Sequence, residues 1–202
     1  MRQVITAPFD VELPGPVIYL GGPVLGADDW RKQAIQYLGE FAPEVHIASP
    51  RAQKFDGNSD RQLSWETAFL HRAAMNGVLL WWLAKETLHR CNRCYAQAAR
   101  FELGEWAARS HAGLARLVVG IERGFTGGSY LRRRLHLDYS NIPVCSTLRQ
   151  TCAASAELAQ APATTTAYPF LASMLRPGAG MAAPGVPSLP DLLNPAGSGK
   201  DR

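Results

Sequence analysis

Short apolar runs alternate along the chain with longer segments whose apolar residues recur at helical spacing. The apolar runs are typical of buried β-strands and cover residues 17–20, 45–48, 77–83, 114–121 and 142–145. A helix is predicted after Asp28 or Asp29, either of which can cap it. Further helices are predicted over residues 64–75, 95–110, 129–137 and 148–160. The chain therefore alternates between strands and helices.

This alternation predicts the class of fold. Strands that are apolar on both faces and separated by helices imply a parallel sheet covered on both sides. We expect an α/β protein with a doubly wound, five-stranded parallel sheet, flavodoxin-like in size. In such folds ligands bind at the carboxyl ends of the strands. The loops after residues 20, 48, 83 and 121 are therefore the first places to look for chemistry.

Composition divides the chain into three parts. Residues 15–160 hold the alternating pattern and form the predicted domain, and residues 1–14 precede it as an N-terminal extension. Residues 161–202 hold seven of the 14 prolines and many alanines and glycines. Such a composition forbids regular helix and offers little to pack. We expect this last part to be a disordered tail.

Charge and apolar content argue against a protein that binds nucleic acid or spans a membrane. The 202 residues are 47% apolar and carry a net charge of only +4, with the basic residues scattered, so nucleic-acid binding is not expected. The longest apolar run, residues 77–84, is far shorter than the ~20 residues that cross a membrane. The N-terminus shows no apolar stretch of signal-peptide length. With four cysteines and no disulfide scaffold, we expect a cytoplasmic protein with no membrane partner.

The cysteines do not predict a metal site. Cys91 and Cys94 form a lone C-x-x-C pair, with His89 nearby but no second close pair. The segment lies in the loop before the third predicted helix, where it can also act as a lid over a pocket. We expect no metal and no cofactor.

Two strand-end loops carry candidate binding residues. Gly21-Gly22-Pro23 follows the first strand, and its glycines let the backbone approach a ligand closely, although a plain tight turn has the same composition. The loop lacks the spacing of a dinucleotide or P-loop motif. Arg51 follows the second strand, where an arginine can bind a phosphate or carboxylate or simply lie at the surface.

Two helices carry candidate carboxylates. Trp65 and Glu66 lie near the start of the second helix and can stack on and hydrogen-bond a ligand, or serve the core and the helix dipole. In the third helix Glu102 lies between Phe101 and Leu103. It can point into the cleft and attack the anomeric carbon of a sugar, or lie solvated on the helix surface.

Taken in order, these residues resemble a known family. The series Ile18-Tyr19-Leu20-Gly21-Gly22-Pro23, Trp30-Arg31, Ser49-Pro50-Arg51, Trp65-Glu66 and Phe101-Glu102-Leu103-Gly104 resembles the nucleoside 2-deoxyribosyltransferase-like family, in its branch with Trp-Arg and Trp-Glu pairs. The likeness covers about residues 17–145. It implies a flavodoxin-like fold and chemistry at the N-glycosidic bond of a nucleoside or nucleotide.

The resemblance also implies roles for single residues. Glu102 matches the glutamate nucleophile, and Tyr19 matches an aromatic residue that orients it. The positions that match residues near the ligand are Gly22, Pro23, Trp30, Arg31, Arg51, Trp65, Glu66 and Asn76. Relatives are commonly homodimers or larger, and we expect the same here.

Two positions depart from the family and keep a second class of function open. Asn76 stands where relatives carry an aspartate that helps to hold or protonate the leaving base, and Ala96 stands where many carry an acidic residue for the sugar hydroxyls. These residues favour a non-catalytic module that senses or binds nucleotides. Glu102 and the Trp65-Glu66 pair favour an enzyme, either a hydrolase or a transferase.

Overall fold

A single parallel sheet forms the centre of the protein. The computed structural model describes residues 2–9, 11, 14–50, 59–89 and 92–162. Its strands are β1 (Val4–Thr6), β2 (Val17–Gly21), β3 (His46–Ser49), β4 (Gly77–Leu83), β5 (Leu117–Ile121) and β6 (Val144–Cys145). They lie in the order β1-β3-β2-β4-β5-β6, and every neighbouring pair is parallel. The predicted α/β class with a parallel sheet is confirmed.

The sheet has six strands, one more than the sequence predicts. The additional strand, β1, lies within the predicted N-terminal extension and pairs with β3 at the edge of the sheet. It is only three residues long, too short for a hydrophobic period to show. Arg51, Cys91 and the predicted tail from residue 163 onward lie outside the described residues.

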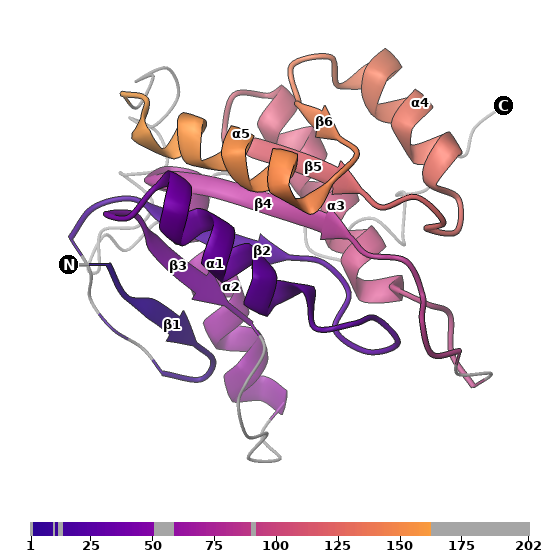
Figure 1. The fold of residues 1–202 in the computed structure, drawn as a ribbon, viewed down its shortest axis with the longest axis horizontal. Coiled ribbons are helices and arrows are strands. Elements are labelled where there is room, and N and C mark those ends of the chain that lie inside the picture. Colours follow the sequence, from indigo (N-terminus) through magenta and orange to yellow (C-terminus); the bar gives the residue numbers. More distant parts are fainter. Residues whose placement is uncertain (1, 10, 12–13, 51–58, 90–91, 163–202) are drawn as a thin grey trace, which may run out of the picture. The chain divides into compact units, whose positions relative to one another are not determined.

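Within the described ranges, five helices cover the two faces of the sheet (Figure 1). They are α1 (Trp30–Phe41), α2 (Ser59–Met75), α3 (Gln97–His111), α4 (Gly128–Asp138) and α5 (Leu148–Gln160). Helices α1 and α5 pack on one face, and α2, α3 and α4 pack on the other. The two faces follow from the alternation of side chains along a strand. Tyr19 and Trp81 therefore point toward α2 and α3, whereas Ile18 and Leu80 point toward α1 and α5.

The chain reverses its path across the sheet between β2 and β4. From β2 it passes through α1 to β3 on one side, and from β4 it passes through α3 to β5 on the other. Helix α2 links β3 to β4 and so crosses over β2. This arrangement leaves a switch point at the carboxyl ends of β2 and β4, where ligands bind in open parallel sheets.

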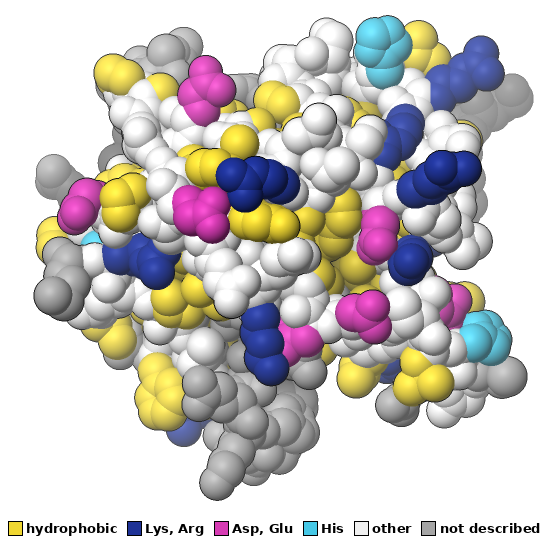
Figure 2. All heavy atoms as spheres, viewed as in Figure 1, with side chains coloured by type: hydrophobic (Ala, Val, Ile, Leu, Met, Phe, Trp, Pro, Cys, Tyr) yellow, Lys and Arg dark blue, Asp and Glu magenta, His cyan; other side chains and the backbone are white. Residues whose placement is uncertain are grey.

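Charged side chains of both signs are interspersed on the face that α1 and α5 cover (Figure 2). None of the helices in the described ranges combines the length and apolar character needed to cross a membrane.

Gly21 and the Trp81 ring pack against each other at the centre of the sheet. The two residues are register partners on β2 and β4, and the Trp81 side chain is fully buried. A Cβ atom on Gly21 would lie 2.2 Å from Trp81 Cε3. The ring therefore occupies the space that any larger residue at position 21 would need.

We predict that Gly21→Ala destabilises the fold by about 1–3 kcal/mol, because overpacking a rigid core forces its neighbours to move. Trp81→Leu should remove most of that penalty, so the two changes should be strongly non-additive in urea unfolding. Gly104→Ala is the matched control. No heavy atom outside its own helix lies within 4 Å of the added methyl group, and it should leave stability unchanged or raise it. Additive effects of the first two changes would contradict the prediction.

Candidate functional site

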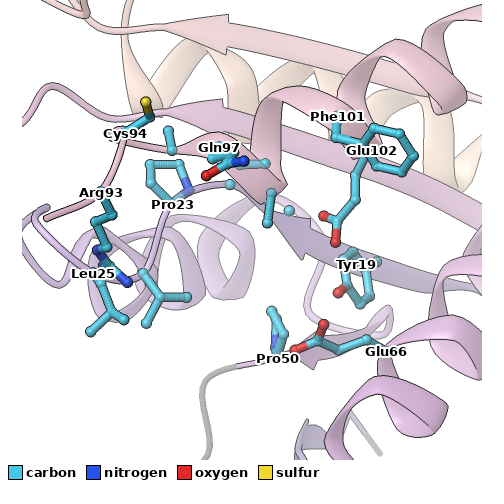
Figure 3. Close-up of a pocket in the computed structure, with 16 residues that line it drawn as sticks. Tyr19, Pro23, Leu25, Pro50, Glu66, Arg93, Cys94, Gln97, Phe101 and Glu102 are labelled. Atoms are coloured by element: carbon cyan, nitrogen blue, oxygen red, sulfur yellow. The ribbon is translucent and has the colours of Figure 1, made fainter. Parts of the chain in front are cut away.

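A cavity of about 570 Å³ opens at the carboxyl edge of the sheet, at the switch point. Tyr19, Glu66 and Glu102 all line it. Each comes from a different element: Tyr19 from β2, Glu66 from α2 and Glu102 from α3. In Figure 3 the two carboxylates approach the Tyr19 ring from different helices. The structure thus brings together three ionisable groups that are distant in sequence.

Tyr19 lies at the base of this cavity. Its side chain is only 2% exposed, yet no described residue forms a hydrogen bond with its hydroxyl group. Burial raises the pKa of the phenol well above its ordinary value, and the nearby Glu66 and Glu102 raise it further. A buried phenol normally finds a partner in the protein or in bound molecules. This hydroxyl is therefore available to a ligand in the cavity.

Glu102 is half-buried on the first half of α3 and points into the cavity (Figure 3). Burial raises the pKa of this carboxyl to about 7, and the negative charges of Glu66 and Glu105 contribute to the rise. The positive charge of Arg31 acts in the opposite direction. A carboxyl that titrates near neutral pH inside a cleft is typical of functional sites.

Glu66 is held in place by its own helix. Gln62, one turn earlier on α2, donates a hydrogen bond of 2.6 Å to Glu66 Oε1 and another of 2.5 Å to the carbonyl of Pro50. Burial raises the pKa of Glu66, whereas the Gln62 hydrogen bond and the charge of Arg31 lower it. One oxygen of the carboxyl is thus fixed, and no described residue hydrogen-bonds to the other oxygen, Oε2.

Gly22 and Pro23 line the cavity, as the sequence predicts for residues near a ligand. Gly22 has a φ of +135°, and a Cβ atom there would lie 2.1 Å from the carbonyl oxygen of Trp82. Only glycine fits this turn, so the backbone of the loop itself forms the wall.

The structure places Trp30 and Arg31 behind this loop rather than in the cavity. The buried Arg31 guanidinium donates hydrogen bonds to the carbonyls of Gly22 (2.8 Å), Pro23 (3.1 Å) and Leu20 (3.3 Å). Trp30 Nε1 donates to Pro23 as well, at 3.0 Å. Neither residue lines the cavity. Their contacts hold the loop that does.

A second set of contacts joins the loop after β2 to the loop after β4. The carbonyl of Gly26 accepts hydrogen bonds from the backbone of Thr87 (2.7 Å) and Leu88 (3.1 Å). Within the loop after β4, Tyr95 donates its hydroxyl proton to the carbonyl of Ala84 at 2.7 Å. The two loops at the switch point are therefore tied to each other.

Two further predicted residues lie away from the cavity. Trp65 is buried against Phe69 and donates its Nε1 proton to the carbonyl of Phe9 at 2.7 Å. Asn76 follows the end of α2 at the amino edge of the sheet, where its amide donates to the carbonyl of Gly15 at 3.2 Å. At 1.5 Å per residue, Asn76 lies about 15 Å from Glu66 along the axis of α2. These two residues do not meet the other site residues.

On a further side of the cavity, the sequence analysis named Ala96 and the loop with Cys94 but not the first residues of α3. The start of α3 lines it with Ala96, Gln97, Ala98 and Ala99, and Arg93 lies just before them. Ala96 has a left-handed backbone with a φ of 56°, which is uncommon outside glycine. The signal that identifies this side is positional: the helix after β4 begins at the carboxyl edge of the sheet.

The fold and the cavity define an α/β protein with a carboxylate-lined pocket at the carboxyl edge of a parallel sheet. No group of three or more His, Cys, Asp or Glu side chains suited to a metal ion occurs in the part of the chain that the structure describes.

No protein-family model and no curated protein match the chain. The chemistry of the site therefore rests on its own residues.

Glu102 should make the stability of the protein depend on pH. Because burial raises its pKa from 4.5 to about 7, its ionisation in the folded state costs free energy that ionisation in the unfolded chain does not. The neutral carboxyl contributes most below pH 4.5, and this contribution is lost as the pH rises through 7. We therefore predict that Glu102→Gln raises the melting temperature more at pH 8 than at pH 5.

Glu40→Gln is the matched control for that measurement, because Glu40 lies at the surface beside Arg149. An equal rise in melting temperature for both variants, or a rise for Glu102→Gln that does not grow with pH, would show that the site does not raise the pKa of Glu102.

Arg31 should contribute more to stability than its neighbour Lys32. Arg31→Met leaves the carbonyls of Leu20, Gly22 and Pro23 without these donors, and we expect a loss of about 3 kcal/mol or more in urea unfolding. Lys32 is exposed and, among the described residues, pairs with Asp29 alone, so Lys32→Met should change stability by less than about 0.5 kcal/mol. Similar losses in the two variants would contradict the role assigned to Arg31.

Proposed function

We propose that this protein cleaves or exchanges the N-glycosidic bond of a nucleoside or nucleotide, with Glu102 as the nucleophile. The observation that carries the proposal is the meeting of Glu102 and Tyr19 in one cavity at the switch point. Its volume of about 570 Å³ falls within the range of about 300–1,000 Å³ typical of small-molecule sites.

The strand order supports the same proposal. Strands β3-β2-β4-β5-β6 have the order 2-1-3-4-5 of flavodoxin-like folds when β1 is left aside. A flavodoxin-like domain is what the resemblance of residues 17–145 implies, and the residues that carry the resemblance include both Glu102 and Tyr19.

The reaction would follow the retaining two-step route. An oxygen of the Glu102 carboxylate bonds to the anomeric carbon, and the electrons of the C–N bond leave with the base. Water or a second base then attacks the same carbon, and the ester bond breaks to restore the carboxylate. In this proposal the Tyr19 hydroxyl would donate a hydrogen bond to the attacking carboxylate, and Gly22 and Pro23 would offer their backbone to the sugar, since all of these residues line the cavity.

One observation favours the second candidate, a module that binds nucleotides without turning them over. Asn76 stands where the family that the sequence resembles has an aspartate, and it lies at the opposite edge of the sheet from the cavity. Ala96, in turn, brings no carboxylate to the cavity wall. For this candidate, a nucleotide should raise the melting temperature without being consumed.

The enzymatic proposal predicts base release that depends on Glu102. The protein is incubated with a panel of nucleosides, deoxynucleosides and their monophosphates, and free base is measured by chromatography. Glu102→Ala should reduce release to the rate in buffer alone, and Glu40→Gln should leave it unchanged. For the active protein, kcat/KM should rise with pH up to about 7, because the nucleophile must be ionised.

Tyr19→Phe separates a functional role from a structural one in the same assay. Loss of one hydrogen bond to a charged group corresponds to about 10- to 100-fold in rate. Since no described residue bonds to the hydroxyl, the melting temperature should not fall. The proposed function would be ruled out if Glu102→Ala still released base, or if the protein released base from no substrate in the panel.

A further inference from the structure

The proposed reaction needs a proton at the leaving base. A purine or pyrimidine that departs without a proton carries the electrons of the C–N bond as negative charge, which raises the barrier. In the family that the sequence resembles, an aspartate before the third predicted strand helps at this step. The matching Asn76 cannot donate an acidic proton, and it is tied to Gly15 about 15 Å along α2 from Glu66. The proton must come from elsewhere.

Few groups in the cavity can supply it. Among the described residues that line the cavity, the ionisable side chains besides Glu102 are Tyr19, Glu66, Arg93 and Cys94. Burial makes the Tyr19 phenol a weaker acid than usual. An arginine does not lose its proton near neutral pH, and Cys94 lies exposed on the loop before α3. Glu66 is the carboxyl that remains.

Glu66 is also held as a proton donor requires. Both protons of the Gln62 amide are used, one on Glu66 Oε1 at 2.6 Å and one on the carbonyl of Pro50 at 2.5 Å. The carboxyl is thereby anchored to the segment that follows β3, with Oε2 left for the cavity. In Figure 3 Glu66 enters the cavity from α2, whereas Glu102 enters from α3, with Tyr19 between them.

We propose that Glu66 is the general acid–base catalyst of this site. This inference rests on the proposed function and names the group that performs its proton transfers. In the first step the Glu66 carboxyl gives its proton to the ring nitrogen of the base as the C–N bond breaks and the Glu102–sugar bond forms. In the second step the Glu66 carboxylate takes a proton from the attacking water or incoming base, and the ester bond to Glu102 breaks. Both carboxyls then return to their starting states.

The two carboxyls lie in one electrostatic environment, and their charges influence each other. Glu102 interacts electrostatically with Glu66 and Tyr19 in the cavity, with Glu105 on its own helix and with Arg31 behind the loop after β2. Glu66 interacts with Arg31 and with its helical neighbour Gln62. Burial raises the pKa of both carboxyls, and to about 7 for Glu102. Glu102 therefore retains a proton near neutral pH that an exposed glutamate would have lost, and the charge of Glu66 contributes to this retention. The proposed roles require this proton on Glu66, and positive charge that develops on the sugar favours that arrangement because it stabilises the ionised form of Glu102.

The test uses two substrates that differ in their need for a proton. One is a purine nucleoside of the panel that the protein accepts, and the other is its N7-methylated form, whose base leaves as a neutral molecule. Glu66→Gln should slow base release from the first substrate by about 100- to 10,000-fold. With the methylated substrate it should give a rapid burst of one free base per site and then slow turnover. Azide, which attacks without losing a proton, should restore that turnover and yield the glycosyl azide.

Three comparisons make the result decisive. Glu40→Gln should behave as the unchanged protein, and Glu102→Ala should show no burst with either substrate. Glu66→Asp, which keeps the acid but retracts it, should retain part of the activity on the unmethylated substrate. The fall of kcat/KM on the alkaline side of the pH profile should disappear in Glu66→Gln, since a structural role for Glu66 would not move it.

The outcomes separate the two proposals. Equal slowing of both substrates by Glu66→Gln, without a burst and without rescue by azide, would overturn the role of Glu66 while Glu102 kept its own. Full activity of Glu66→Gln on the unmethylated substrate would do the same. Absence of base release by the unchanged protein from either form of every nucleoside would overturn the proposed function, and the role of Glu66 with it.

Discussion

The buried guanidinium of Arg31 is the contact on which the cavity depends. The end of β2 and the loop after it present the carbonyls of Leu20, Gly22 and Pro23 to the Arg31 guanidinium, and such groups are costly to bury without donors. Arg31 supplies the donors from the first turn of α1, and its neighbour Trp30 adds one more. Because the other side of the same loop forms a wall of the cavity, a contact beneath the loop fixes the shape of the site above it.

The same cation acts on the site through its charge. It lowers the pKa of Glu66, Glu102 and Tyr19, against the stronger effect of burial that raises each of them. Without this cation, both carboxyls would hold their protons more tightly, because burial and the Arg31 charge act in opposite directions on each pKa. The site therefore combines partial burial with one cation behind the loop.

The pattern of apolar and polar residues in the sequence predicts much of the fold, but it predicts the positions of single side chains less well. Strand and helix periodicity predicted the parallel α/β sheet, but not β1, whose three residues become a strand only by pairing with β3. Tyr19, Glu66 and Glu102, which the sequence analysis singled out, line one cavity because the carboxyl ends of parallel strands share one edge of the sheet. Trp65 turned out to face the core, since packing decides which way the side chains of a helix point. Asn76 lies away from the cavity because of the direction of α2: a helix that starts at the carboxyl edge of the sheet must end at the amino edge.

The directions of the helices across the sheet also explain why Glu66 and Glu102 line the same cavity. Helix α2 connects β3 to β4 and must cross over β2, which lies between them in the sheet. A residue in the first half of α2 that faces the sheet therefore lies above the carboxyl end of β2, where Tyr19 stands. Helix α3 starts at the carboxyl end of β4, the other neighbour of β2, so its first turns reach the same point from the opposite side. Two carboxylates 36 residues apart in sequence thus converge on one phenol through topology, and residues near the far ends of these helices cannot do so.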